Sequence, residues 1–228
     1  MLEYNEFNLY LIRHGQSAVN VIPDNIGQAP DTPLTEYGKQ QAALLGDRLA
    51  KEVGQFLYTY SSNYTRALDT AKIATQPFNN NIQICPALRE YSAGDWAGSK
   101  RSQTISPQIA LRMGHMNSDF IPPNGESMNQ VQRRVSQWLE ETILYNSDIQ
   151  QIALSLRQSN KPKMNLGVFS HGMTIRCLLA HLIGIDKSFI WKIEISNTSI
   201  TKLSFGEDGW RLLCVNDCAH LLHGVRGS

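Results

Sequence analysis

Residues 8–15 read NLYLIRHG, an apolar run that ends abruptly in Arg13, His14 and Gly15. Two later stretches have the same form: residues 55–62 read QFLYTYSS, and residues 165–172 read NLGVFSHG. Short apolar runs that alternate with helical segments are typical of parallel strands in an α/β sheet. We therefore predict strands at residues 8–12, 55–60 and 165–169, each of which delivers polar residues to one edge of the sheet.

Helical segments follow these predicted strands. After Thr35, apolar residues recur at the spacing of one helix face, at Ala42, Leu45, Leu49 and Val53. Thr35 is predicted to cap this helix and Gly54 to end it. Three further helices are predicted to start at Ser61-Ser62, with Arg66 close to the first turn, at about Glu126, and after Gly172.

Residues 98–125 have a different character from the rest of the chain. They are polar, contain Pro107, Pro122 and Pro123, and show weak periodicity. We interpret this segment as a lid-like excursion from the core. Strand and helix patterns resume after it, so a single domain is predicted over residues 1–228.

The bulk composition excludes several classes of protein. The chain has 228 residues, a formal net charge of +1 and 42% hydrophobic residues, so no global charge favours nucleic acid or a membrane surface. No apolar run is long enough to cross a membrane, and the N-terminus does not resemble a signal peptide. The cysteines lack zinc-binding spacing, which favours free thiols in a reducing cytoplasm. The oligomeric state is left open. The cysteines are Cys85, Cys177, Cys214 and Cys218.

Two histidines and two arginines are expected to converge at the carboxyl edge of the sheet, where open α/β sheets bind ligands. They are Arg13 and His14 after the first strand, Arg66 near a helix start, and His171 after the last strand. A neutral histidine nitrogen can attack phosphorus, and arginine binds phosphate oxygens through its planar fork. The pattern therefore favours phosphoryl transfer.

The motifs around these residues resemble, in order, those of the histidine phosphatase superfamily, the phosphoglycerate-mutase-like proteins. They are residues 11–20 (LIRHGQSAVN), 61–71 (SSNYTRALDTA), 88–98 (LREYSAGDWAG), 124–127 (NGES) and 170–176 (SHGMTIR), with Asn197, Asn216 and His220 in a closing segment. One RHG tripeptide is a weak signal, but an ordered set that covers nearly the whole chain is specific. The resemblance implies a three-layer α/β/α sandwich with a mostly parallel sheet.

The resemblance also implies a role for individual positions. His14 would become the phosphohistidine, and Glu90 would be the general acid and base, with Asp95 as its rival. No metal or cofactor is implied. The remaining implied contacts to the phosphoryl group or substrate come from Arg13, Arg66, His171, Asn20, Gly27, Gln28, Gly172 and Met173.

Some positions depart from the family pattern or carry two interpretations. Ile26 stands where a hydroxyl is common, Met173 is expected to narrow the pocket through its side chain, and Tyr64 could contact substrate. Arg176 is expected to form an internal ion pair. Basic residues of the excursion could meet a second anionic group or simply be solvated: Lys100, Arg101 and Arg112. His220 is expected to be structural, and ordinary polar roles are expected for His115, His181 and His223.

Three functions are compatible with these residues. The first is a phosphomonoester hydrolase of the histidine acid phosphatase type, in which water takes the phosphoryl group of a small metabolite from His14. The second is a cofactor-dependent phosphoglycerate mutase, and the third is a non-catalytic binding protein. The motif from Glu90 to Trp96 resembles the phosphatase branch, and the excursion is short for a mutase. The phosphatase is therefore favoured.

Overall fold

A six-stranded sheet forms the centre of the computed structural model, which describes residues 6–27, 31–78, 80–159 and 163–222. The strands are β1 (Phe7–Arg13), β2 (Tyr58–Ser61), β3 (Ile82–Ile84), β4 (Met164–Ser170), β5 (Ile200–Gly206) and β6 (Gly209–Asp217). Their order is β3-β2-β4-β1-β5-β6. The first four strands in this order are parallel, whereas β5 pairs antiparallel with β1 and β6. The predicted, mostly parallel sheet is confirmed.

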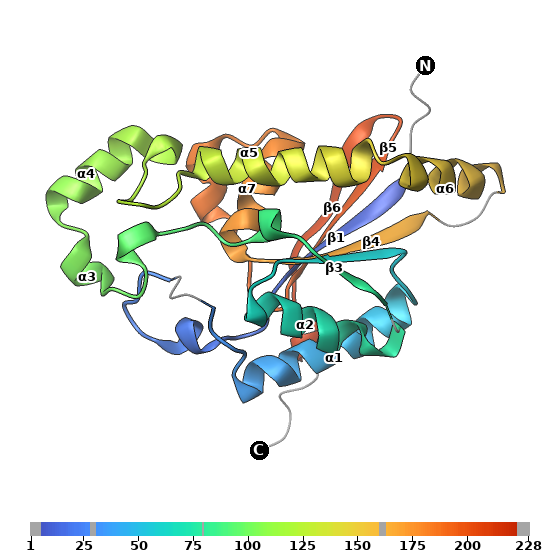
Figure 1. The fold of residues 1–228 in the computed structure, drawn as a ribbon, viewed down its shortest axis with the longest axis horizontal. Helices are drawn as coiled ribbons and strands as arrows, with labels where there is room; N and C mark the ends of the chain where they lie inside the picture. Colours follow the sequence, from blue (N-terminus) through green and yellow to red (C-terminus); the bar gives the residue numbers. More distant parts are fainter. Residues whose placement is uncertain (1–5, 28–30, 79, 160–162, 223–228) are drawn as a thin grey trace.

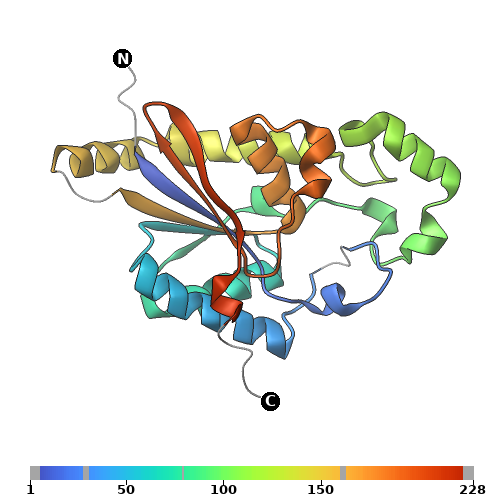
Figure 2. The ribbon, with the colours of Figure 1, turned by 180° about the vertical axis from the view of Figure 1, so that it is seen from behind.

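Helices cover both faces of the sheet, as Figures 1 and 2 show from opposite sides. One face carries α1 (Glu36–Glu52), α2 (Thr65–Thr75) and the short α8 (Ala219–Leu222), which contacts α1. The other face carries α5 (Met128–Leu139), α6 (Ser147–Gln158) and α7 (Gly172–Ile183). This arrangement confirms the three-layer α/β/α sandwich.

The excursion at residues 98–125 contains α3 (Arg101–Thr104), α4 (Pro107–Met116) and a 3-10 turn, Asn117–Asp119. Ser106 caps α4 by accepting a hydrogen bond from the Ile109 amide, and Pro107 occupies the first helical position. In Figure 1 these helices, in green, lie beyond the carboxyl ends of β1 and β4. The excursion is therefore placed on the side where the predicted catalytic residues emerge.

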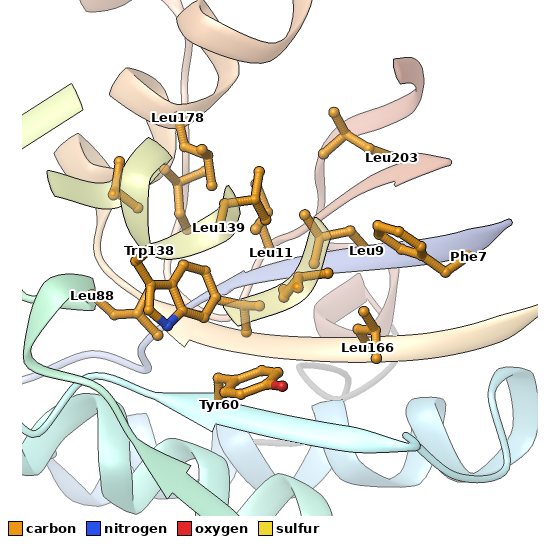
Figure 3. Packing of buried hydrophobic residues seen from close by; sticks show 14 of the residues in the cluster. Phe7, Leu9, Leu11, Tyr60, Leu88, Trp138, Leu139, Leu166, Leu178 and Leu203 are labelled. Carbon is orange, nitrogen blue, oxygen red and sulfur yellow. The ribbon is translucent and has the colours of Figure 1, made fainter. Parts of the chain in front are cut away.

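Successive side chains of β1 point to opposite faces of the sheet, which explains why the core has two halves. Phe7, Leu9 and Leu11 belong to the larger buried cluster, on the face covered by α5 and α7 (Figure 3). Tyr10 and Ile12 belong to a second cluster, with residues of α1 and α2. Successive strand residues point to opposite faces, so a strand buried on both sides must be apolar throughout.

The second strand and helix begin later than the sequence predicts. β2 covers Tyr58–Ser61, and α2 starts at Thr65 rather than at the two serines. Ser62 does not cap the helix, because its hydroxyl accepts a hydrogen bond from the Tyr64 amide in the preceding turn. This turn separates the end of the strand from Arg66 and leaves Ser62 facing the site.

Two glycines allow the loop after β1 to contact the start of α1. A Cβ atom on Gly38 would lie 2.0 Å from the Gln16 carbonyl oxygen, and one on Gly15 would lie 2.6 Å from the Gly38 oxygen. Thr35 caps the helix at this point, as predicted, by accepting a hydrogen bond from the Gly38 amide. Backbone therefore packs directly on backbone beside His14.

We expect Gly38→Ala to lower the free energy of unfolding by about 1–3 kcal/mol, the usual cost of overpacking. Alanine in place of glycine normally stabilises a helix by up to about 1 kcal/mol, so a loss would report the clash. Urea denaturation measures it. Gly114→Ala in α4 is the matched control, because nothing lies within 4 Å of its added Cβ. Equal effects of the two substitutions would contradict the close approach.

Candidate active site

His14 follows the last residue of β1 and is 3% exposed. Its amide donates a hydrogen bond to the Ser170 carbonyl, and its ring Nδ1 lies 2.7 Å from the Gly15 carbonyl oxygen. A carbonyl oxygen only accepts hydrogen bonds, so Nδ1 carries the proton and Nε2 keeps its lone pair. The fold thus sets the tautomer in which Nε2 is unprotonated.

Arg66 lies against this nitrogen. Its Nε is 3.3 Å from His14 Nε2, and the side chain is only 1% exposed. Thr70, one turn further along α2, accepts a hydrogen bond from the Gly15 amide and donates one to the Arg66 carbonyl. This threonine, which the sequence analysis did not identify, fixes α2 to the loop that carries His14.

His171 follows β4 and is completely buried. Its ring centroid lies 5.1 Å from that of His14, and its Nε2 is 2.9 Å from the Ser62 hydroxyl oxygen. The Tyr64 ring meets the His171 ring edge-on at 5.5 Å. Tyr64 therefore packs against a candidate catalytic ring, a contact that strand and helix patterns do not reveal.

Arg13 points from the end of β1 toward the start of α7. Its Nη1 donates a hydrogen bond to the Ile195 carbonyl at 2.6 Å, and a Cβ on Gly172 would lie 3.6 Å from its Nε. Arg176, one turn along α7, donates from Nε to the Ile193 carbonyl instead of forming the expected ion pair. Within the described ranges, no carboxylate lies within 4 Å of its guanidinium.

Glu90 contacts the first turn of α7. Its Oε1 accepts hydrogen bonds from the Met173 and Thr174 amides at 3.1 and 3.2 Å, and from its neighbour Tyr91 at 3.0 Å. Helix N-termini attract anions because their amides lack intrahelical partners. The Met173 amide, predicted to bind phosphate, is thus occupied by Glu90. Arg134 of α5 supports this segment by donating to the Glu90 carbonyl.

The remaining predicted residues differ in their contacts and exposure. Asp95, the rival acid, is exposed, and its carboxylate accepts a hydrogen bond from Asn124. The Asn20 carboxamide oxygen accepts hydrogen bonds from the Ser17 amide and hydroxyl. Gly27 lines the cavity described below, and Gln28 lies outside the described residues.

Burial determines the charge state of the two histidines. It is the main reason that the pKa of His14 lies well below its usual value of 6.5, and the positive charges of Arg13 and Arg66 lower this pKa further. The pKa of His171 is lowered in the same direction, first by burial and then by neighbouring positive charge. Arginine stays charged even when burial lowers its pKa. The centre thus combines two neutral imidazoles with two guanidinium groups.

A cavity of about 830 Å³ opens beside this centre. Arg13, Glu90 and Gly172 line it, and so do residues of the excursion. Glu90 reaches the cavity whereas Asp95 is not among its lining residues, which favours Glu90 as the acid that meets a substrate. Arg101 also lines it, but Lys100 and Arg112 do not.

A C-terminal segment holds the backbone of the Arg13-His14 pair. The Asn197 side chain donates to the His14 carbonyl, and the Thr198 amide donates to the Arg13 and His14 carbonyls. Thr198 has a φ of 56°, an unfavourable conformation for a β-branched residue. Its hydroxyl lies 3.0 Å from Nε2 of the buried His220. The sequence resemblance placed Asn197 and His220 in a closing segment without predicting these contacts.

The stability of this segment should depend on pH. Burial is the first cause that lowers the pKa of His220 to about 4, whereas an unfolded chain has the usual value of 6.5. The unfolded state therefore binds the proton first, and His220 contributes a loss of about 3 kcal/mol as pH falls from 6.5 to 4. We expect His220→Gln to flatten the fall in unfolding free energy over this interval, measured by urea denaturation. The exposed His115→Gln is the control, and an unchanged slope in His220→Gln would contradict the buried neutral histidine.

The fold and the carboxyl ends of β1 and β4 define an α/β protein that gathers two neutral histidines and two arginines in one place. The model of the histidine phosphatase superfamily (branch 1) matches residues 9–218. The chain belongs to this superfamily, as the motifs predict. Every helix within the described ranges falls short of the length and apolar character that a membrane crossing requires.

Similar proteins carry both mutase and phosphatase names. A probable phosphoglycerate mutase GpmB from Yersinia pestis (strain Pestoides F) is 28% identical over 221 residues, which cover 93% of this chain and 94% of that protein. A mycobacterial glucosyl-3-phosphoglycerate phosphatase, solved with VO3, is 27% identical with a TM-score of 0.75, covering 92% of this chain and 98% of that one. A phosphoserine phosphatase mutant from Entamoeba histolytica, solved with phosphoserine, is 25% identical with a TM-score of 0.70, covering 94% and 99%.

Proposed function

We propose that this chain is a metal-independent phosphomonoester hydrolase that acts through a phosphohistidine at His14 on a small phosphorylated metabolite. The observation that carries the proposal is the hydrogen bond from His14 Nδ1 to the Gly15 carbonyl. It leaves the lone pair of Nε2 beside Arg66, in a ring whose pKa is well below its usual value. A neutral nitrogen next to fixed positive charge can attack a phosphate dianion.

In the first step, His14 Nε2 forms a bond to phosphorus while the bond from phosphorus to the ester oxygen breaks. Arg13, Arg66 and His171 bind the phosphoryl oxygens, whose charge is spread in the transition state. Glu90, protonated at this stage, gives its proton to the departing alkoxide, which leaves as the alcohol. The product is a phosphoenzyme with Glu90 as carboxylate.

In the second step, water attacks the phosphorus and the bond to His14 Nε2 breaks. Glu90 takes the proton from the attacking water, so it begins the next cycle protonated. Inorganic phosphate leaves and His14 returns to its starting tautomer. The place of Glu90 in the lining of the cavity, beside Arg13, supports one residue serving both steps.

A phosphoglycerate mutase is the second candidate, and the 28% identity to a probable phosphoglycerate mutase favours it. In that reaction the phosphoryl group returns from His14 to another hydroxyl group of the substrate. Two features support the hydrolase instead: the motif that follows Glu90 resembles the phosphatase branch, and the similar solved structures named above are phosphatases.

The test is phosphate release from a panel of phosphomonoesters in the presence of EDTA, followed in parallel by phosphorus NMR of phosphoglycerate mixtures. We expect inorganic phosphate with EDTA present and slow or absent interconversion of phosphoglycerates. Interconversion without net phosphate release would favour the mutase. Neither activity from folded protein would favour a binding protein.

A further inference from the structure

The wall of the cavity beyond the phosphate position is mostly apolar. Four aromatic side chains line it, from three stretches of the chain: Tyr91, Trp96, Phe120 and Trp191. Methionines contribute from α4, α5 and α7, at Met113, Met128 and Met173. Such side chains bind apolar groups by excluding water, and methionine adapts to irregular shapes.

One side of this wall is continuous with the core. Met128 is 9% exposed and Met173 is 6% exposed, and both pack in one buried cluster with Val131, Cys177 and Ile190. Tyr91 packs against the same cluster. This side is therefore held in place by α5 and α7, and it offers a preformed surface rather than loosely placed side chains.

Another part of the wall is an aromatic pair formed by Trp96, just before the excursion, and Phe120, near its end. The Trp96 and Phe120 rings have centroids 5.5 Å apart and planes 31° apart. Trp96 stands at the end of a 3-10 turn, Gly94–Trp96, and Phe120 follows the turn after α4.

The size and chemistry of the cavity disfavour a small acid as its occupant. A volume of about 830 Å³ lies within the range of pockets for drug-sized ligands. Arg101 and Arg176 could pair with a carboxylate, but a three-carbon acid would leave the aromatic and methionine wall in contact with water. A phosphomonoester with an apolar body would cover that wall and gain its burial energy.

We infer that the substrate is a phosphomonoester whose body is a bulky apolar group, an aromatic ring or an alkyl chain, packed against Trp96, Phe120, Met128 and Met173. The inference rests on the proposed function for the orientation of the phosphate. It adds the chemical class of the leaving alcohol, which the catalytic residues do not determine.

Binding of phosphonates tests this inference separately from catalysis, because their carbon–phosphorus bond is not hydrolysed. Isothermal titration calorimetry would compare ethylphosphonate, carboxyethylphosphonate and phenylpropylphosphonate. We expect the phenylpropyl compound to bind at least about 10-fold more tightly than ethylphosphonate, from burial of one aromatic side group. Ethyl and phenylpropyl phosphates, which release primary alcohols of similar acidity, should show the same order in kcat/KM.

Trp96→Ala should reduce the ratio of the phenylpropylphosphonate affinity to the ethylphosphonate affinity by about 10-fold, because an aromatic contact is lost. Leu111→Ala is the matched control, because Leu111 lies on α4 with 64% exposure and does not line the cavity. If Trp96→Ala does not fold, the ratio of phenylpropylphosphonate to ethylphosphonate affinity in the wild-type protein still tests the inference. Tightest binding by carboxyethylphosphonate, or equal binding of all three, would overturn the inference. Tight phenylpropyl binding without hydrolysis of any ester would support the inference and contradict the proposed hydrolase.

Discussion

The His14→Ala variant is expected to lose phosphate release by at least about 10⁴-fold, because a reaction that proceeds through a phosphohistidine has no route without its nucleophile. Arg13, Arg66 and His171 would remain, so binding of a phosphonate should survive far better than turnover. Measurement of kcat and of phosphonate affinity in the same preparation separates these effects. The residual rate reports what positive charge alone contributes.

Trapping of the intermediate makes this result specific. After a rapid quench, the wild-type protein should carry labelled phosphate from a phosphomonoester, bound as an acid-labile and base-stable phosphohistidine. The label should be absent from His14→Ala. His115→Ala is the matched control, because His115 lies exposed on α4 and does not line the cavity. Full turnover by His14→Ala, or label on another residue, would contradict the proposed nucleophile.

Sequence reasoning succeeded for the central strands, for a physical reason. β1 and β4 are buried on both faces along most of their length, so the continuous apolar runs at residues 9–12 and 166–169 stand out from their surroundings. β3, β5 and β6 were not predicted, and β3 and β6 form the two edges of the sheet. Along β6, exposed residues such as Leu213 and Val215 alternate with partly buried ones. The apolar run of β6, residues 212–215 (LLCV), is short and was not singled out as a strand.

The strand pattern predicts a site residue only where its position follows from the end of a strand. Arg13, His14 and His171 are such residues, because parallel strands bring their carboxyl ends to one edge, whereas Arg66 and Glu90 were predicted from a helix start and from the motif resemblance. The partner that each side chain selects depends on segments far apart in the sequence. Glu90 uses the amides of α7, and Arg176 selects the Ile193 carbonyl instead of a carboxylate. No local pattern contains that information.

The Glu90→Gln variant is expected to lower kcat/KM for an alkyl phosphate by about 10²–10⁴-fold, the usual contribution of general acid catalysis. Glutamine keeps a carbonyl oxygen that can accept the hydrogen bonds of Met173 and Thr174, so the start of α7 should stay in place. The amide cannot give a proton to the leaving oxygen. The loss should therefore come from the chemistry rather than from the fold.

The acidity of the leaving group distinguishes an acid from a residue that only orders the helix. Nitrophenolate departs without a proton, so kcat/KM for nitrophenyl phosphate should fall much less in Glu90→Gln than the value for an alkyl phosphate. The second step still needs a base to activate water, so phosphoenzyme should accumulate with the activated ester. Asp95→Asn is the control, since Asp95 is exposed and does not line the cavity. Equal losses for both esters would assign Glu90 a positioning role, and a loss confined to Asp95→Asn would transfer the acid role to that residue.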